Sequence, residues 1–263
     1  MTSHIQITTD LDWRKKYPEM IRTPDQALKL VKPGQRLFIG TACGEPSALV
    51  EALTKRGGEL CDVEIIQLLT KGDAPYAARW LEECFHLNSF FIGQAVRGHI
   101  QEGLGDYTPT LLSDIPRLFS SGRIPLDVAL IQVSEPDSRG KVSLGVSVDV
   151  VRSAAENASL VIAQVNPRMP RTLGDSFIDI YDIDLLVPEE REIISRESSS
   201  PTPETRKIGE HLAALIENGS TLEFGIGRIP HSLMEFLRDK RDLGIHTEMC
   251  FASAGIGKSI PLS

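Results

Sequence analysis

Hydrophobic positions follow two different spacings along the first two thirds of the chain. Short continuous apolar runs predict buried strands at 35–40, 63–69, 127–133 and 159–165. Apolar residues at helical spacing predict helices over 25–34, 45–58, 114–125 and 148–158. Continuous apolar strands separated by helices are typical of a mainly parallel sheet covered on both faces. The pattern therefore predicts an α/β fold.

A polar segment, residues 189–207, interrupts this rhythm with three consecutive serines and two prolines. Such a composition is typical of a linker. We therefore predict a first α/β domain over 1–190, a linker over 191–207 and a partial second domain over 208–263.

The segment after the linker resembles the beginning of the chain. Residues 36–53 and 220–237 each hold a strand pattern, a glycine turn, a proline and an amphipathic helix pattern. At one constant offset four identities align, namely Pro46 with Pro230, Leu49 with Leu233, Glu51 with Glu235 and Leu53 with Leu237. Each segment follows a helix pattern opened by Thr-Pro, so we predict an internal repeat of two related α/β units. The same offset places Glu248 opposite Glu64.

The second copy of the repeat is short. It holds two predicted helices and two predicted strands, and two strands do not make an independently stable sheet domain. We therefore expect the second unit either to fold against the first or to be part of something longer.

Charge and composition exclude some classes of function. The net charge of -8 and the pI near 5.3 argue against nucleic-acid binding, which requires clustered Lys and Arg. The apolar runs are too short to span a membrane, and the polar N-terminal segment contains no apolar leader, so we expect a cytoplasmic protein. The four cysteines form no C-x-x-C pair, which predicts buried, reduced thiols.

Two glycine turns stand at strand-to-helix junctions, at 40–44 and 225–227. Backbone N–H groups at such turns can bind a phosphate or an oxyanion, although tight-turn geometry alone also accounts for the glycines. The loops 133–151 and 90–109 are long enough to reach over a site at the carboxyl end of a strand. In the loop 90–109, Arg97 and His99 could contact an anion. The alternative for the loop 133–151 is an ordinary β-turn, and the alternative for the loop 90–109 is a surface loop with a solvated arginine.

Other catalytic patterns are missing from the sequence. The histidines form no H-x-x-H or H-E-x-x-H pattern, so no metal site is predicted. A G-x-S-x-G nucleophile elbow is also absent, which argues against a Ser-His-Asp hydrolase. By spacing alone, Glu248 is a strand carboxylate of the kind that is usually solvated.

Seven motifs in order resemble the acetyl-CoA hydrolase/transferase family, which includes the 4-hydroxybutyrate and acetate CoA-transferases. They are GQRLFIGTACGEP, FFIGQAVRGHIQEGLGDYTP, SDIPRLF, VSEPDSRGKVSLGVSVDVV, VNPRMPRTLGDSFI, TLEFGIGRIP and LGIHTEM. The resemblance covers residues 12–249 and implies two related CoA-transferase-like α/β domains, the second of them incomplete here.

The resemblance also implies a mechanism, in which the glutamate of the HTEM motif attacks an acyl-CoA thioester and becomes a glutamyl-CoA thioester. In this chain that residue is Glu248. The resemblance then implies that acyl-CoA and small carboxylates are the substrates. It implies no bound cofactor or metal, and it is compatible with a homo-oligomer. Further candidates for oxyanion, CoA or substrate binding are Gly225, Ile226, Gly227, Arg228, Glu135, Asp137, Gly140, Ser143, Gly145 and Arg97.

The chain departs from the family after Met249. The family continues with a Ser-Asp-Gly-type segment, whereas residues 250–263 do not match, which we interpret as a shifted reading frame or a truncation. Three hypotheses follow: a CoA-transferase or acyl-CoA hydrolase, a non-catalytic fragment of such an enzyme that at most binds a ligand or partner, and a sugar-phosphate isomerase or deaminase on a related fold. The last leaves the HTEM motif unexplained.

Overall fold

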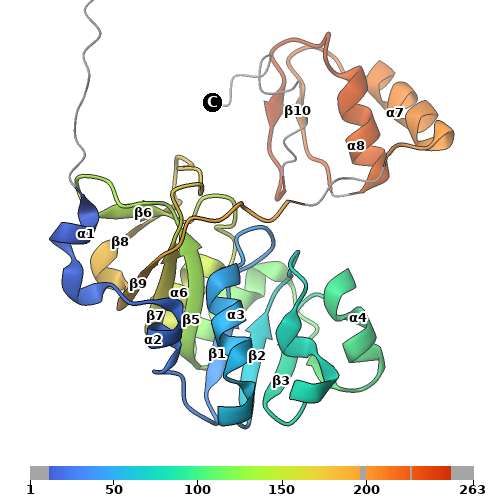
Figure 1. The fold of residues 1–263 in the computed structure, drawn as a ribbon. Coiled ribbons are helices and arrows are strands. Elements are labelled where there is room, and N and C mark those ends of the chain that lie inside the picture. Colours follow the sequence, from blue (N-terminus) through green and yellow to red (C-terminus); the bar gives the residue numbers. More distant parts are fainter. Residues whose placement is uncertain (1–11, 196–199, 226, 250–263) are drawn as a thin grey trace, which may run out of the picture. The chain divides into compact units, whose positions relative to one another are not determined.

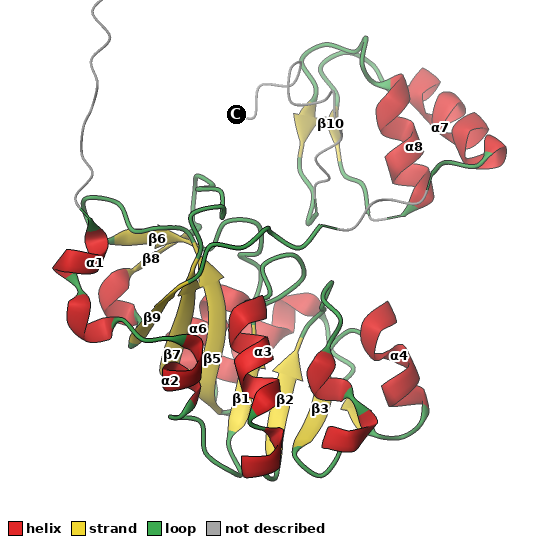
Figure 2. Cartoon of the chain, viewed as in Figure 1, coloured by secondary structure: helices red, strands yellow, loops and turns green. Residues whose placement is uncertain are grey.

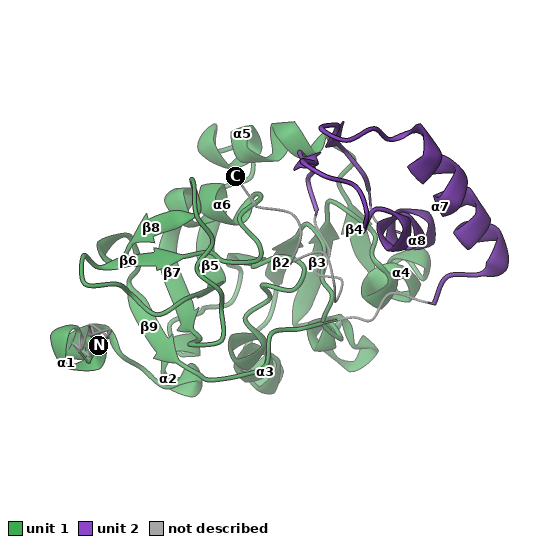
Figure 3. Ribbon diagram, turned by 90° about the horizontal axis from the view of Figure 1, so that it is seen from above, with its two compact units in different colours: residues 1–195 green, residues 196–263 purple. Residues whose placement is uncertain are grey.

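The computed structural model describes residues 12–195, 200–225 and 227–249. The chain divides into two compact units, unit 1 over residues 1–195 and unit 2 over residues 196–263 (Figure 3). The division falls inside the segment 191–207 that the sequence marks as a linker. The last strand of unit 1 ends at Pro188, and the first helix of unit 2 begins at Pro203.

Unit 1 is built on a seven-stranded sheet in the order β4-β3-β2-β1-β5-β7-β9, and every neighbouring pair is parallel (Figure 1). The strands are β1 (Arg36–Ile39), β2 (Val63–Gln67), β3 (Phe85–Ser89), β4 (Gly105–Tyr107), β5 (Leu126–Val133), β7 (Ala158–Val165) and β9 (Leu185–Pro188). A separate antiparallel pair joins β6 (Lys141–Ser143) to β8 (Phe177–Asp179).

Helices cover both faces of this sheet (Figure 2). The α-helices of unit 1 are α1 (Trp13–Lys16), α2 (Pro24–Leu28), α3 (Ser47–Lys55), α4 (Gln94–Gln101), α5 (Ile115–Ser120) and α6 (Val151–Asn157). Short 3₁₀ turns are η1 (Pro18–Met20), η2 (Gly57–Glu59), η3 (Pro75–Ala77), η4 (Arg79–Leu81), η5 (Leu112–Asp114) and η6 (Ile180–Asp182).

Alternate residues of each central strand enter different cores, as the pleat of a strand requires. In β1, Leu37 and Ile39 pack with α2 and α3, whereas Phe38 packs with α5 and α6. Because both faces are buried, such strands are apolar throughout, which is the pattern that predicted β1, β2, β5 and β7.

The segment 90–109, expected as a loop, contains a helix and a strand. Helix α4 buries only Val96, and β4 has no fully buried residue, so neither produces a clear apolar pattern. Strand β3 was also missed, because its exposed and partly buried polar residues break the apolar run.

Unit 2 pairs two helices with two short parallel strands. They are α7 (Pro203–Leu215), β10 (Thr221–Leu222), α8 (Arg228–Phe236) and β11 (Gly244–Ile245). Its core consists of Ala213, Leu233, Met234, Leu237 and Leu243. The helices approach closely at Gly209, where an added Cβ would lie 3.0 Å from the Ser232 hydroxyl oxygen. None of the described helices in either unit is both long and apolar enough to cross a membrane.

The two units share one order of elements, which confirms the internal repeat. The series α2-β1-α3-β2 and α7-β10-α8-β11 both join two parallel strands through a helix. Each series also begins with a capping box at its Thr-Pro pair: the Thr23 side chain accepts from the backbone N–H of Gln26, and Thr202 accepts from Thr205.

The strand register corrects the predicted partner of Glu248. Leu37 of β1 lies opposite Ile65 of β2, and the matching Thr221 of β10 lies opposite Gly244 of β11. Gly244 therefore corresponds to Ile65, and Glu248 corresponds to Leu69 rather than to Glu64. The constant offset fails because the connection from the first strand to the second is five residues shorter in unit 2.

Two glycines with left-handed backbone conformations differ in what surrounds them. Gly145 has φ +62°, and an added Cβ would lie 2.2 Å from the Met169 Sδ, whereas Gly122 has φ +69° and open space. We expect Gly122→Ala to destabilise unit 1 by about 1 kcal/mol, from backbone strain alone. Gly145→Ala should cost roughly 3 kcal/mol or more, since Met169 must also move.

Denaturant unfolding followed by tryptophan fluorescence measures this difference, because Trp13 and Trp80 both belong to unit 1. Equal shifts of the unfolding midpoint for the two variants would contradict the crowding at Gly145.

Candidate functional site

The sheet of unit 1 has a topological switch point between β1 and β5. From β1 the chain adds β2, β3 and β4 on one side, and then begins the other side with β5 (Figure 1). Ligands of open α/β sheets bind outside the carboxyl ends of the strands at such a point. The loop after β1, residues 40–46, and the loop after β5, residues 134–140, flank it.

Hydrogen bonds connect the glycine turn after β1 to the segment that follows β6. The Ser147 hydroxyl accepts a 3.2 Å hydrogen bond from the backbone N–H of Gly44, and the Thr41 hydroxyl donates to the Asp149 carboxylate. An added Cβ on Gly44 would lie 2.7 Å from the Ser147 Cβ, so this approach requires glycine. The structure thus brings together the turn 40–44 and the loop 133–151, both of which the sequence marked.

A buried polar layer lies beneath this turn. On the sheet face that packs against α2 and α3, the last positions of four strands are polar instead of apolar, and these residues are Gln67, Ser89, Gln132 and Gln164. Gln132 donates to the Glu45 carbonyl oxygen (3.0 Å), and Gln164 accepts from the Ala48 N–H in the first turn of α3 (2.9 Å). The Gln164 amide also donates to Gln132 (3.2 Å). The layer fixes the turn after β1 to the sheet.

Glu45 is an acidic residue inside this arrangement, and its side chain is only 3% exposed. Its carboxylate accepts a hydrogen bond from the Thr70 hydroxyl. Burial raises the pKa of the Glu45 carboxyl, the Thr70 hydrogen bond lowers it in part, and Asp73 raises it further. Glu45 belongs to the first of the seven motifs, but its sequence pattern predicts no role for it. A carboxylate directly before the proline of the turn is the signal that could have pointed to it.

The loop after β5 is held by Arg171, which the sequence analysis did not single out. One guanidinium nitrogen donates to the Ser134 hydroxyl (3.1 Å) and to the carbonyl oxygens of Glu135 (2.9 Å) and Lys141 (3.1 Å). The second terminal nitrogen, Nη2, donates to the Asp137 carboxylate (3.1 Å). The Glu135 carboxylate accepts from the Trp13 indole N–H (3.0 Å). Both predicted acidic residues therefore lie in this loop, where each accepts a side-chain hydrogen bond.

The remaining predicted residues of this region support the β6–β8 pair. Ser143 is fully buried, and its hydroxyl lies 3.3 Å from the hydroxyls of Thr172 and Ser176 and accepts from the Gly145 N–H (3.1 Å). Gly140 has φ +78° and accepts at its carbonyl oxygen from the N–H of Ile180 (2.9 Å). Arg97 lies apart from this group, exposed on α4.

In unit 2, Glu248 lies beyond the end of β11 rather than on the strand. Strand β11 ends at Ile245, and the Glu248 side chain is exposed. The Thr247 hydroxyl before it donates to the Phe224 carbonyl oxygen (2.5 Å). Since Phe224 directly precedes Gly225, this hydrogen bond holds the HTEM segment beside the second glycine turn.

The second glycine turn leads directly into α8. Gly227 is the N-cap residue of α8 with φ +138°, a conformation that side chains rarely adopt, and Arg228 is the first residue of the helix. Gly225 is exposed, and Ile226 lies outside the described residues.

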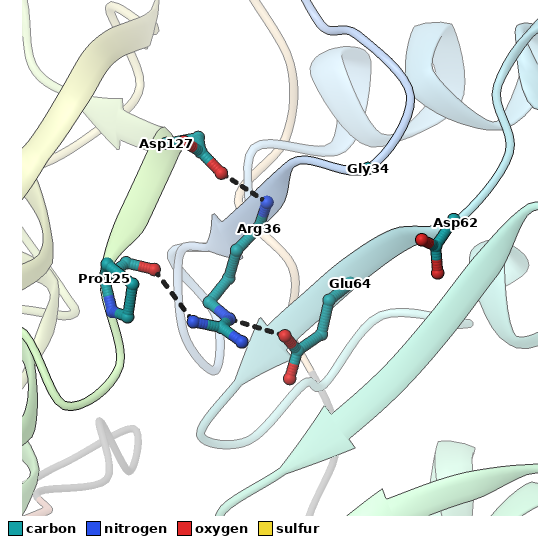
Figure 4. Close-up of a pocket in the computed structure, with 6 residues that line it drawn as sticks. All are labelled: Gly34, Arg36, Asp62, Glu64, Pro125 and Asp127. Atoms are coloured by element: carbon teal, nitrogen blue, oxygen red, sulfur yellow. Dashed lines mark hydrogen bonds and ion pairs between the residues drawn. The ribbon is translucent and has the colours of Figure 1, made fainter.

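A pocket lies at the opposite, amino end of the sheet of unit 1 (Figure 4). Its Arg36 guanidinium forms an ion pair with Glu64 (2.5 Å) and donates to the Pro125 carbonyl oxygen (3.4 Å). The Arg36 N–H donates to the Asp127 carboxylate (2.7 Å). These contacts join the amino ends of β1, β2 and β5, which gives the charged side chains a structural role.

Two sequence-based expectations concern metals and thiols. In residues 12–195, 200–225 and 227–249, no three His, Cys, Asp or Glu side chains are placed so that they could hold a metal ion. Cys43, Cys61 and Cys84 are free thiols, but none of the three is fully buried as predicted, because Cys43 and Cys84 are partly buried and Cys61 is exposed. Cys250 lies outside the described residues.

Known proteins resemble this chain along most of its length. It is 41% identical to the 4-hydroxybutyrate coenzyme A transferase of Clostridium kluyveri, in an alignment that covers 91% of this chain and 56% of that protein. It is 37% identical to the succinyl-CoA:acetate/propanoyl-CoA:succinate CoA transferase of Fasciola hepatica, over 89% of the chain and 49% of that protein. The chain thus spans about half the length of the curated relatives it matches.

Solved structures confirm the predicted fold class. RipA from Yersinia pestis aligns with a TM-score of 0.86 at 30% identity, over 94% of this chain and 60% of that one. The 4-hydroxybutyrate CoA-transferase of Porphyromonas gingivalis aligns with a TM-score of 0.77 at 31% identity, over 94% of this chain and 58% of that one.

The family comparison covers nearly all of unit 1. The sequence model of the acetyl-CoA hydrolase/transferase N-terminal domain matches residues 6–196. Together with the relatives above, this match confirms the resemblance inferred from the seven ordered motifs. The chain belongs to the acetyl-CoA hydrolase/transferase family.

Proposed function

We propose that this protein transfers CoA between an acyl-CoA and a small carboxylic acid, or hydrolyses the acyl-CoA, through a glutamyl-CoA thioester on Glu248. The observation that carries the proposal is the position of Glu248: an exposed carboxylate at the carboxyl end of β11, held beside a glycine turn at the start of α8. Membership of the family supports it, since the relatives are named as CoA-transferases of small acids.

The reaction begins with attack of a Glu248 carboxylate oxygen on the carbonyl carbon of the acyl-CoA. The carbon–sulfur bond breaks, CoA leaves as the thiolate, and an acyl-glutamyl anhydride remains. The thiolate then attacks the glutamyl carbonyl of this anhydride and expels the acyl group as its carboxylate. Glu248 now holds CoA as a thioester, so one difficult exchange has become two easier steps.

The second half of the reaction regenerates Glu248. An acceptor carboxylate attacks the glutamyl thioester and releases the CoA thiolate, and the thiolate then attacks the acceptor carbonyl of the new anhydride. The product is a new acyl-CoA and a free Glu248 carboxylate. When water attacks the thioester instead and loses a proton, the outcome is hydrolysis.

Every step passes through a tetrahedral oxyanion, which preorganised N–H donors stabilise. We assign this role to the turn 225–227, because a glycine turn at a helix N-terminus offers backbone N–H groups and a favourable dipole. Arg228 contributes positive charge for the anionic substrates. In unit 1 we keep Glu135, Asp137, Gly140, Ser143, Gly145 and Arg97 as candidate contacts for CoA or the substrate acid.

A second candidate function is a module that binds acyl-CoA or a protein partner without turnover. The described part of unit 2 favours it, because β10 and β11 are two residues long and α7 exposes an apolar stripe. The stripe consists of Ile208 (41% exposed), Leu212 (38%) and Leu215 (80%). This module would bind CoA without exchange and would self-associate through the stripe.

Replacing the proposed nucleophile tests the enzyme hypothesis. With acetyl-CoA as donor and 4-hydroxybutyrate as acceptor, we expect Glu248→Ala to lower exchange on the order of 10³-fold or more, because no covalent intermediate can form. The matched control is Glu217→Ala, which removes an exposed carboxylate that precedes the amino end of β10. This control should leave the rate unchanged.

Chemical trapping gives an independent result from the same protein. Borohydride added after acetyl-CoA should inactivate the wild type and convert Glu248 to the corresponding alcohol, detected by peptide mass spectrometry. Full activity in Glu248→Ala would exclude the proposed nucleophile.

Calorimetry and sedimentation distinguish the binding module from the enzyme. The module predicts CoA binding by the wild type with no exchange, and concentration-dependent association that Leu212→Glu together with Leu215→Glu abolishes. Turnover by a monomeric wild type would rule it out.

A further inference from the structure

Glu45 is a buried carboxylate to which the proposed reaction gives no role. It lies at the topological switch point, directly before Pro46, the N-cap residue of α3. Its hydrogen-bond donor is the neutral hydroxyl of Thr70 rather than a cation. On its other side the carboxylate packs against the backbone of Gly72, where an added Cβ would lie 2.2 Å from the Glu45 Oε1. The carboxylate therefore fills the space between two loops.

A carboxylate in this position costs stability. Desolvation penalises its charged form, and one hydrogen bond from a hydroxyl compensates for this only in part. Burial raises the pKa of Glu45, and burial together with the charge of Glu45 raises the pKa of the buried Tyr76. An amide of the same shape would avoid the charge. Groups that are held in unfavourable electrostatic surroundings at a ligand-binding edge are typical of functional sites.

The contacts of Glu45 determine the course of residues 70–74, which we call the β2 loop. The Thr70 hydroxyl donates to Glu45 and accepts from the N–H of Gly72 (3.0 Å), so one chain of hydrogen bonds runs from the carboxylate into the loop. Beside it, the Ala42 N–H donates to the Leu69 carbonyl oxygen (2.7 Å). Ala42 and Ala74 both have φ +48°, a conformation that alanine adopts only when its surroundings impose it.

We propose that Glu45 is a positioning residue for binding of the small carboxylic acid, which clamps the β2 loop to the turn after β1 at the carboxyl end of the sheet of unit 1. The inference rests on the proposed function, since it assigns the carboxyl end of unit 1 to substrate binding. Glu45 does not react and acts through Thr70. Its loss loosens the connection between the two loops, and loops that are less firmly positioned bind the acid less tightly.

A double-mutant cycle tests whether Glu45 acts through Thr70. Glu45→Gln keeps the shape and removes the charge, so the Thr70 hydroxyl donates to a neutral amide oxygen in a weaker hydrogen bond. Thr70→Val keeps the shape and removes the hydroxyl. We expect each variant to lower kcat/KM for the acceptor acid about 10-fold, mainly through KM. The double variant should be no worse than Thr70→Val alone, because Glu45→Gln weakens the same hydrogen bond that Thr70→Val removes. Thr70→Ser is the matched control and should retain the wild-type value.

Stability separates positioning from a merely structural role. We expect Glu45→Gln to keep or raise the denaturant midpoint of unit 1 while kcat/KM falls. Because the pKa of Glu45 is raised, the folded state binds its proton more tightly than the unfolded state does. Wild-type stability is therefore lost progressively as pH rises from about 4.3, the unfolded value, through the raised pKa. Over that pH window the free energy of unfolding of Glu45→Gln should increasingly exceed that of the wild type. The neighbouring ionisable groups Asp73, Tyr76 and Lys71 are the same in both proteins.

Hydrogen–deuterium exchange of the whole chain measures the clamp independently of activity. Thr70→Val and Glu45→Gln should accelerate exchange of the Gly72 amide several-fold, and Thr70→Ser should not. Unchanged exchange in both variants would overturn the clamp. Wild-type turnover with unaltered kcat/KM in both variants would overturn the positioning role and leave the proposed function intact. Absence of wild-type turnover would overturn the proposed function, while the exchange data would still decide the clamp.

Discussion

The architecture of unit 1 depends on how polar groups are satisfied at the carboxyl end of its parallel sheet. The central strands are buried on both faces, yet in β2, β3, β5 and β7 the last position on one face is glutamine or serine. Two of these side chains bond backbone groups: Gln164 accepts from the first turn of α3, where N–H groups lack partners within the helix, and Gln132 donates to the turn after β1. Because a buried polar group without a partner is costly, the layer allows the loops few alternative positions.

This constraint orients the backbone groups at the switch point. The turn after β1 is fixed from below by Gln132, on one side by Thr70 and on the other by Ser147. A substrate that binds there would meet a surface whose backbone groups are already oriented, so little ordering entropy would be lost on binding. The proposed nucleophile belongs to unit 2, in which a smaller copy of the same α/β arrangement places Glu248 beside its own glycine turn.

Prediction from sequence succeeded where burial on both faces produced continuous apolar runs, as in β1, β2, β5 and β7. It failed for β3, β4 and α4, where exposed positions interrupt the pattern. The sequence predicted the repeat, but its constant offset assigned Glu248 the wrong counterpart. The difference in residue number between matching positions changes after a connection of different length. Arg171 was missed because its acceptors are carbonyl oxygens and a carboxylate 30 or more residues away.

The sequence by itself determined the α/β class, the family and the proposed nucleophile, because apolar spacing and ordered motifs are local properties of the chain. Only the tertiary structure decided that Glu248 lies beyond β11 and that Glu45 is buried against Thr70. Strand register and burial depend on which segments meet in space. Thr70 is 25 residues from Glu45 and joins it because parallel strands bring their carboxyl ends to the same edge of the sheet.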